Sequence, residues 1–438
     1  MNLIHKINII LYVLVGIIPN LESIDKVTTQ WLYLNLLNTI SLLFYLIIDY
    51  PLKNILKSKV SILFLCFFFW STISMVFAIN RIESLVVLSQ ILAIVIAFFV
   101  LTICIKKIEK PFKFISNVIS IFLIIELVNI YFPFFILDEA KSKIFNRSSI
   151  FLGFAANINI TAFSIIYKLP FFIFSIMQSK KNKFLLYFIA LLVFSLIIFA
   201  AGTLNSTRGA ILTYSLLVPI LIIISISIYI KSKESRLFVF SCIYGLTVLL
   251  SYPSNLLLAD SYNKSESSIT NRISSLNALI DKEVNLDQSL TQRKDFYKQA
   301  LITIKNNPVF GVGIGNWKIK SIDTNKENIV GYTVPYHVHN DYLEIGAEIG
   351  LVGLSIYLSI LFFSFRKYVS RFFKLILPHS TLEKNYLEII LVSIFLFIWI
   401  LDSNFNFPFH RPIELINLIA LLAYLNSKKI SNKYEKQI

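Results

Sequence analysis

Long apolar runs separated by short polar stretches dominate the hydropathy pattern of this chain. A membrane-spanning helix needs about 20 mostly apolar residues, and twelve stretches reach or approach that length. They cover residues 4–20, 31–49, 60–79, 85–105, 112–137, 157–178, 184–204, 209–230, 237–258, 342–364, 386–401 and 412–426. The pattern predicts an all-α integral membrane protein with about 12 transmembrane helices.

The composition agrees with this prediction. Hydrophobic residues make up 56% of the 438 positions and charged residues only 15%, and the mean hydropathy is +0.72, so the chain is far more apolar than an ordinary soluble domain. Its cysteines, Cys66, Cys104 and Cys242, fall inside predicted spans, where Cys acts as a small hydrophobe. They indicate neither disulfides nor a metal framework.

Lys and Arg are distributed unevenly over the connections between spans, and this bias sets the orientation of a membrane protein. The side that carries both chain ends holds 23 of the 41 basic residues, whereas the short connections of the opposite side hold seven. Both termini are therefore predicted to be cytoplasmic. The net charge of +16 is scattered over many loops, so it does not indicate binding of nucleic acid.

One long connection divides the chain into three predicted parts. Residues 1–258 form an N-terminal transmembrane bundle of about nine spans, residues 259–341 a large periplasmic loop, and residues 342–438 about three further spans. Within the loop, residues 261–290 are predicted to be irregular, and 291–307 to form an amphipathic helix that begins after Thr291. The following FGVGIGNW (310–317) is predicted to be a Gly-rich turn; it lacks the βαβ context of a nucleotide-binding loop.

Ionisable residues gather where this loop meets the tenth predicted span, in YTVPYHVHNDYLEIGAEIGLVGL (332–354). A charge inside a membrane costs several kcal/mol unless it serves a cavity or a partner, so this junction is the predicted site. In a helix, Asp341, Glu344 and Glu348 lie on one face. Gly346 and Gly350 form a G-x-x-x-G pair that predicts close packing of another span.

His339 has the chemistry of a general base, since a neutral imidazole can take a proton from a sugar hydroxyl. Two alternatives stay open. In the first, His339 is a structural residue that caps the helix. In the second, His337, His339 and Asp341 form a metal site.

Basic residues on the same outer side form the complementary half of the predicted site. Arg208, Arg147 and Arg293 can donate bidentate hydrogen bonds to phosphate; the alternative for each is an interfacial anchor or a lipid-headgroup contact. Lys168, near the middle of span six, is a candidate for lining the cavity. LDSNFNFPFHRP (401–412), with Asp402, His410 and Arg411, is interpreted as a structural lip.

Three segments resemble the O-antigen ligase and polymerase superfamily of bacterial envelope glycosyltransferases. They are STRGA (206–210), the NPVFGVGIGNW turn (307–317) after a loop helix that carries Arg293, and HNDYLEIGAEIGLVGL (339–354). The Asn-Pro-Asn expected before span six reads Ala-Asn-Ile-Asn here, at 156–159. The resemblance covers the second half of the chain, whereas the first 140 residues share only hydrophobic spans.

The resemblance implies an enzyme that transfers a glycan from undecaprenyl pyrophosphate to an acceptor hydroxyl at the outer face of the inner membrane. It implies no cofactor, no metal and no nucleotide sugar. His339 matches the catalytic His and Arg208 the Arg that holds the pyrophosphate. Arg147, Arg293, His337, Asp341, Glu344 and Lys168 are then expected to bind substrate.

Three acceptors fit this reaction: a lipid A core sugar (ligase), another lipid-linked repeat (polymerase), or a protein Ser or Thr. We favour the ligase, because the loop ends directly in span ten and no extra soluble domain exists to hold a protein. A carrier or exporter of lipid-linked glycans is the alternative of another class, since it also needs outward arginines and a polar cavity.

Overall fold

The computed structural model describes residues 2–19, 21, 27–48, 53–136, 152–155, 157–201, 207–261, 288–324, 335–377 and 380–434, and within these ranges every regular element is helical. The N-terminal part contains α1 (Asn2–Leu14), α2 (Thr28–Ile47), α3 (Lys53–Leu56), α4 (Lys59–Ser74), α5 (Arg81–Lys106), α6 (Pro111–Ile136), α8 (Ile158–Met177), α9 (Lys183–Phe199), α10 (Arg208–Ser232) and α11 (Arg236–Ser261). It is followed by α13 (Gln288–Asn306), α14 (Trp317–Thr324), α15 (Asp341–Ile376), α16 (Tyr386–Phe405), the 3-10 turn η6 (Pro408–His410) and α17 (Pro412–Tyr434).

The chain is an α-helical membrane protein by the length and hydropathy of its helices. Among the described residues, eight helices are long and apolar enough to cross a membrane: α2, α4 with its 3-10 extension to Phe77, α5, α6, α8, α10, α15 and α16. Three shorter apolar helices cover Asn2–Ile17, Lys183–Phe199 and Arg236–Ser251. Each of the twelve predicted ranges overlaps a helix, but these findings do not confirm a count of twelve spans.

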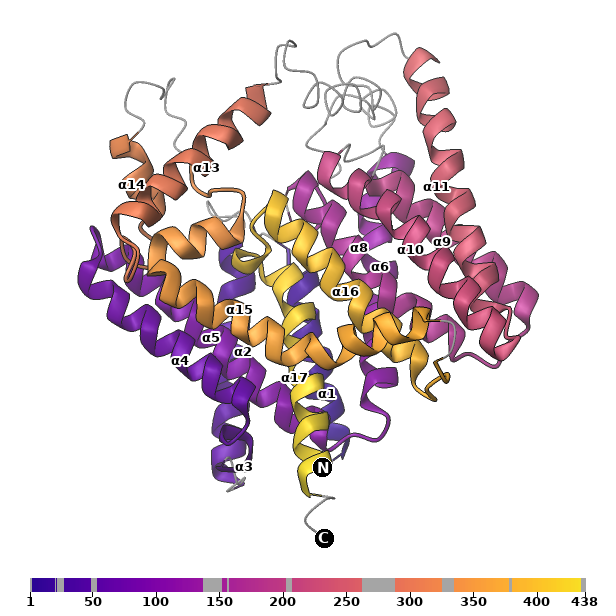
Figure 1. Ribbon diagram of the computed structural model, residues 1–438, viewed down its shortest axis with the longest axis horizontal. Coiled ribbons are helices and arrows are strands. Elements are labelled where there is room, and N and C mark those ends of the chain that lie inside the picture. Colours follow the sequence, from indigo (N-terminus) through magenta and orange to yellow (C-terminus); the bar gives the residue numbers. More distant parts are fainter. Residues whose placement is uncertain are drawn as a thin grey trace.

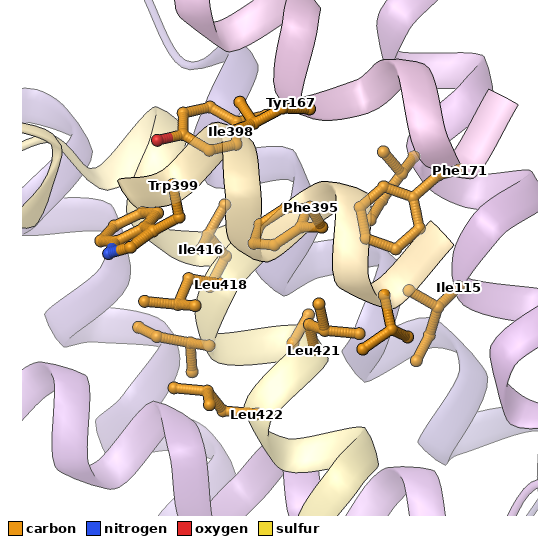
Figure 2. Packing of buried hydrophobic residues seen from close by; sticks show 14 of the residues in the cluster. Ile115, Tyr167, Phe171, Phe395, Ile398, Trp399, Ile416, Leu418, Leu421 and Leu422 are labelled. Carbon is orange, nitrogen blue, oxygen red and sulfur yellow. The ribbon is translucent and has the colours of Figure 1, made fainter. Parts of the chain in front are cut away.

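The bundle has a buried centre and an apolar outer surface. Nearly all of α8 is buried, whereas α2 and α4 expose many large apolar side chains, as expected for helices that face lipid. Figure 2 shows Phe395 and Trp399 of α16 meeting Tyr167 and Phe171 of α8 above the leucines of α17. Because α17 also packs on α5, and α15 on α4, the segments 1–258 and 342–438 form one bundle.

Both chain ends lie at one end of this bundle, and α13 and α14 lie at the opposite end (Figure 1). The predicted loop helix is present as α13, although it begins at Gln288, so Thr291 is inside it and is not its N-cap. The sequence did not predict α14. Most of the predicted irregular stretch 261–290 lies outside the described residues.

Helix α15 is broken at Gly350, whose φ of 72° and ψ of 177° are not helical. The carbonyls of Ala347 and Glu348 therefore lack helical donors, and they accept from the backbone N–H groups of Val312 and Gly313. Backbone polar groups freed inside a membrane bundle require such partners. The Gly-rich turn thus completes the broken helix.

The predicted packing role of Gly346 and Gly350 is wrong. A Cβ on Gly350 would lie 2.0 Å from the carbonyl oxygen of Val309, and one on Gly346 would lie 3.0 Å from Ile304 of α13. Both glycines therefore admit the segment 304–311 and do not admit another span. The physical reason is the break itself, because it ends the continuous helix that a G-x-x-x-G seam requires.

Candidate functional site

A cavity of about 570 Å³ lies between the start of α15, the Gly-rich turn and α5. We call it the Glu344 cavity. It is lined by Val27, Trp31, Glu83, Val86, Val87, Gln90, Gly315, Lys318, Tyr336, His337, Glu344, Glu348, His410 and Arg411. Its wall therefore combines carboxylates, cationic groups and two aromatic side chains, which distinguishes it from the apolar interior of the bundle.

Glu344 is buried at the centre of a cluster in this wall, formed with the half-buried His337 and His410 and called here the Glu344 cluster. Its Oε1 lies 2.8 Å from His337 Nδ1 and 3.1 Å from His410 Nε2. Its Oε2 accepts a hydrogen bond from the backbone N–H of Val338 at 2.8 Å. One carboxylate thus joins α15, the segment before it and η6.

The two imidazoles of this cluster differ in charge. Burial lowers the pKa of His337 to about 4 against the opposing pull of Glu344, so His337 is neutral at pH 7. Burial also lowers the pKa of His410, but Glu344, Asp341 and Glu348 outweigh it and raise the pKa to about 9. His410 therefore carries the positive charge that compensates Glu344.

The same three side chains also form a donor set that could hold a metal ion. His337, Glu344 and His410 each offer one ligand atom, and these atoms lie within 4.8 Å of one another. Two imidazoles and a carboxylate suit Zn²⁺. The set differs from the one considered from the sequence, because His410 takes the place of His339 and Glu344 that of Asp341.

The other two carboxylates of α15 hold neighbouring segments. Asp341 Oδ2 accepts from the backbone N–H of Phe409 at 3.1 Å and so fixes η6. Glu348 Oε1 accepts from the backbone N–H of Trp317 at 3.1 Å and so fixes the start of α14. The predicted polar face exists, but each residue on it has a different partner.

Asn316 attaches the Gly-rich turn to the connection between α4 and α5. Its Oδ1 accepts from the backbone N–H of Asn80 at 2.7 Å, and its Nδ2 donates to Ser84 Oγ at 2.8 Å. Ser84 in turn donates to the carbonyl of Ile314. The motif GVGIGN is therefore a structural support of the cavity wall.

Arg208, Arg293 and His339 form a second part of the site, called here the arginine side. Arg208 is the first residue of α10, where the positive end of the helix dipole adds to its own charge. Arg293 of α13 donates to the carbonyl of Phe405 at 2.9 Å. Burial and the charge of Arg208 lower the pKa of Arg293. A Cβ on Gly209, next to Arg208, would lie 3.4 Å from Phe405 Cβ, so the start of α10 and Arg293 both lie near Phe405.

His339 lies beside these arginines in a strained backbone conformation. Its φ is 61°, which is uncommon for a residue other than glycine. Its ring stacks on Phe296 of α13, and its buried Nδ1 has no hydrogen-bond partner among the described residues. Burial, followed by the charge of Arg293, lowers the pKa of His339 to about 3, so its imidazole is neutral and able to accept a proton.

Phe407 connects the two parts of the site. His337, which lines the cavity, stacks on its ring at 4.1 Å between centroids, and His339 approaches the same ring edge-on at 5.1 Å. The Arg411 guanidinium lies 4.6 Å from the ring centroid. The arginine side and the Glu344 cavity are therefore one aromatic side chain apart.

Among the predicted residues that the structure describes, Lys168 is not brought to this site. Arg147 lies outside the described residues. Lys168 lies between α8 and α6, where its Nζ donates to Glu126 Oε2 and Ser164 Oγ, both at 2.6 Å. Only 2% of the Lys168 side chain is exposed, and it does not line the Glu344 cavity.

Several site residues were missed from the sequence. His410 and Arg411 were interpreted as a structural lip, and Glu83, Lys318 and Tyr336 were not considered. A usable signal existed for His410, since His and Arg beside a proline interrupt an otherwise apolar pair of spans. No local pattern marks Glu83, because its role depends on the distant turn that it faces.

Comparisons with known proteins bear on this arrangement. No curated protein matches the chain significantly. Residues 193–358 match the family model described as O-antigen ligase. This range holds the whole arginine side and all of the α15 carboxylates, and leaves His410 and Arg411 outside. Residues 193–358 are thus similar to the O-antigen ligase family, the superfamily that the sequence motifs resemble.

Proposed function

We propose that this protein is a membrane glycosyltransferase of the O-antigen ligase type, which moves a glycan from undecaprenyl pyrophosphate to an acceptor hydroxyl. The observation that carries the proposal is the arginine side within the family match: Arg293 and the start of α10, which carries Arg208, both lie near Phe405, and His339 packs on the same helix as Arg293. We further propose that the site faces the periplasm, in the inner membrane, with both termini in the cytoplasm.

The arginine side suits the leaving group of this reaction. When the bond between the anomeric carbon and the pyrophosphate oxygen breaks, negative charge grows on that oxygen. Fixed guanidinium groups in a partly buried site stabilise such charge strongly. Arg208 and Arg293 are proposed to bind the pyrophosphate, with the N-terminal end of α10 adding to the field.

His339 is proposed to remove the acceptor proton. As the acceptor oxygen forms its bond to the anomeric carbon, its proton passes to the imidazole, and the pyrophosphate departs as the anion. A single displacement of this kind inverts the anomeric configuration. A pKa of about 3 makes a weak base, but a bound pyrophosphate would offset the charge of Arg293 and raise that pKa, so donor binding itself would activate His339.

The remaining predicted residues take supporting parts in this proposal. His337, Asp341 and Glu344 are proposed to shape the acceptor side, as their contacts with η6 and Val338 suggest. Arg147 stays a candidate from the sequence alone. Lys168 is not retained as a substrate contact, because its ammonium group is buried against Glu126.

The ligase is favoured among the possible reactions, with a lipid A core sugar as acceptor. A polymerase or a protein O-oligosaccharyltransferase would use the same arginine side with another acceptor. A carrier of lipid-linked glycans also needs cations for the pyrophosphate, but it has no use for a strained neutral histidine beside them.

The test is transfer from purified undecaprenyl-pyrophosphate glycan to lipid A core in liposomes, with product analysis by mass spectrometry. Wild type is compared with Arg208→Ala and with Lys298→Ala, which removes an exposed charge elsewhere on α13. The ligase proposal expects glycosylated core from wild type and Lys298→Ala, and at least a ~100-fold loss with Arg208→Ala.

Other products decide between the alternatives. Longer lipid-linked chains would replace the ligase by the polymerase. Movement of the donor across the bilayer without any glycosidic product would replace the enzyme by the carrier.

A further inference from the structure

The Glu344 cavity differs chemically from the arginine side. Carboxylates of Glu83, Glu344 and Glu348 are interspersed with the cationic groups of Lys318, His410 and Arg411 in its wall. A phosphate group would approach the carboxylates at a repulsive distance, whereas a hydroxyl can donate to a carboxylate and accept from a cation. The wall therefore favours a ligand rich in hydroxyl groups over an anion.

Two aromatic side chains give the cavity apolar surfaces beside these polar groups. Trp31 lines the wall and is 5% exposed, and Tyr336 lies at the rim with 63% of its surface exposed. Sugars combine apolar C–H faces with hydroxyl edges, so aromatic rings next to charged groups match both parts of such a ligand.

Trp31 adds an independent observation. Its indole N–H is buried and has no acceptor among the described residues. A buried donor without an acceptor costs about 1–3 kcal/mol. Because Trp31 lines the cavity, a rotation of its side chain on binding would bring this covered N–H to a ligand oxygen.

The rim of the cavity is fixed in place before any ligand arrives. Lys318 Nζ lies 2.6 Å from Glu83 Oε2, and it donates to the Tyr336 hydroxyl at 3.0 Å. These contacts join α5, α14 and the segment before α15. A preformed rim reduces the ordering that binding requires.

We propose that the Glu344 cavity binds the acceptor sugar, with Trp31, Tyr336, Glu83 and Lys318 as contact residues. The identification of this sugar as the acceptor rests on the proposed function. The binding of a sugar in the cavity does not depend on it. The volume of about 570 Å³ suits about one or two sugar rings. Phe407, which contacts both His337 of the cavity wall and His339, then marks the side of the pocket from which the acceptor hydroxyl would reach the base.

The experiment measures binding of free D-glucose, D-galactose and N-acetylglucosamine to the full chain in lipid nanodiscs, by saturation-transfer NMR without donor. Tyr336→Ala removes an exposed ring and is expected to weaken binding about 10-fold. Trp31→Phe keeps a ring but deletes the N–H, and it is expected to weaken binding about 3- to 10-fold. Lys298→Ala and Arg208→Ala are expected to bind like wild type.

A second readout uses the transfer assay with lipid A core. Tyr336→Ala is expected to raise the KM for the core about 10-fold and to leave the KM for the donor unchanged. Absence of binding by all three sugars, or binding that is lost in Arg208→Ala and retained in the cavity variants, overturns the inference. Sugar binding at the cavity without any glycan transfer would contradict the proposed function. The inference that the cavity binds a sugar would still hold.

Discussion

Among the residues that the structure describes, the Lys168–Glu126 pair and the Glu344 cluster differ in what surrounds them. The Lys168–Glu126 pair joins α8 to α6, with side chains that are 2% and 0% exposed. The Glu344 cluster joins three segments of the chain, and its members line a cavity. Both looked costly enough to be functional, since charges inside a membrane usually serve a site.

The difference shows that burial of a charge does not by itself identify a functional residue. Lys168 already has a carboxylate and a hydroxyl within hydrogen-bonding distance. His410 and Glu344 also satisfy each other, but they do so at the wall of a space large enough for a ligand. Access to a cavity and convergence of several segments distinguish the Glu344 cluster, the candidate functional cluster, from the Lys168–Glu126 pair.

The largest expected effect comes from breaking the structural pair. Lys168→Met leaves Glu126 buried without its counter-charge, which is expected to lower stability by about 3–5 kcal/mol. Thermal unfolding in detergent measures this loss. The double variant Lys168→Met with Glu126→Leu removes both charges and is expected to recover most of it.

Transfer by that double variant sharpens the comparison. Its rate per folded molecule is expected to equal that of wild type, because neither residue lines the Glu344 cavity. A lower transfer rate in the well-folded double variant would contradict this expectation and would show that Lys168 contributes to the substrate site.

Glu344→Gln tests the other cluster. The amide keeps the shape of the carboxylate but removes the charge that holds His410, so the transfer rate is expected to fall about 100-fold, with a smaller loss of stability than for Lys168→Met. Rates and unfolding are measured on the same preparations. An unchanged rate would make the Glu344 cluster as purely structural as the Lys168–Glu126 pair.

Stability is expected to depend on pH through His410. Its pKa is raised from 6.5 to about 9 in the folded protein, so its stabilising contribution is complete below about pH 6.5 and is lost as pH rises through about 9. The change between pH 7 and pH 10 is expected to be about 1–3 kcal/mol. In His410→Gln this part of the pH profile should be flat; an identical decline in both proteins assigns it to other groups.

The smallest expected effect is that of chelation. Both imidazoles of the Glu344 cluster already bond to one carboxylate oxygen, so removal of divalent metals with EDTA is expected to leave transfer unchanged. Activity that disappears with EDTA and returns with Zn²⁺ would instead make the cluster a metal centre.

Much of the fold was predictable from hydropathy, because long apolar runs reveal helices whatever their neighbours are. The break at Gly350 was not, since Gly346 and Gly350 have the spacing of an ordinary packing motif. Only the close approach of Val309 shows why glycine is needed at 350. Helix formation does not by itself give the span count, because Lys183–Phe199 is shorter than the roughly 20 residues that a crossing needs.

The site was predictable only where its residues are close in sequence. His337, His339 and the carboxylates of α15 stand together, so their chemistry was visible. Lys318 reaches the cavity through tertiary packing, and nothing near it in the chain indicates this. For His410 the sequence offers one signal, the His-Arg pair beside a proline between two apolar stretches. Lys168 was wrongly predicted to line the cavity, because its partner Glu126 lies 42 positions away in the sequence. The sequence therefore did not show that the charge of Lys168 is already paired.

The most direct test of the account is single-turnover transfer by His339→Asn, with donor binding measured in parallel on the same nanodiscs. The account predicts that the variant binds the undecaprenyl-pyrophosphate donor like wild type and transfers its glycan about 100- to 10,000-fold more slowly. Donor binding and transfer both at wild-type level would contradict it, because the proton of the acceptor would then need no base at position 339.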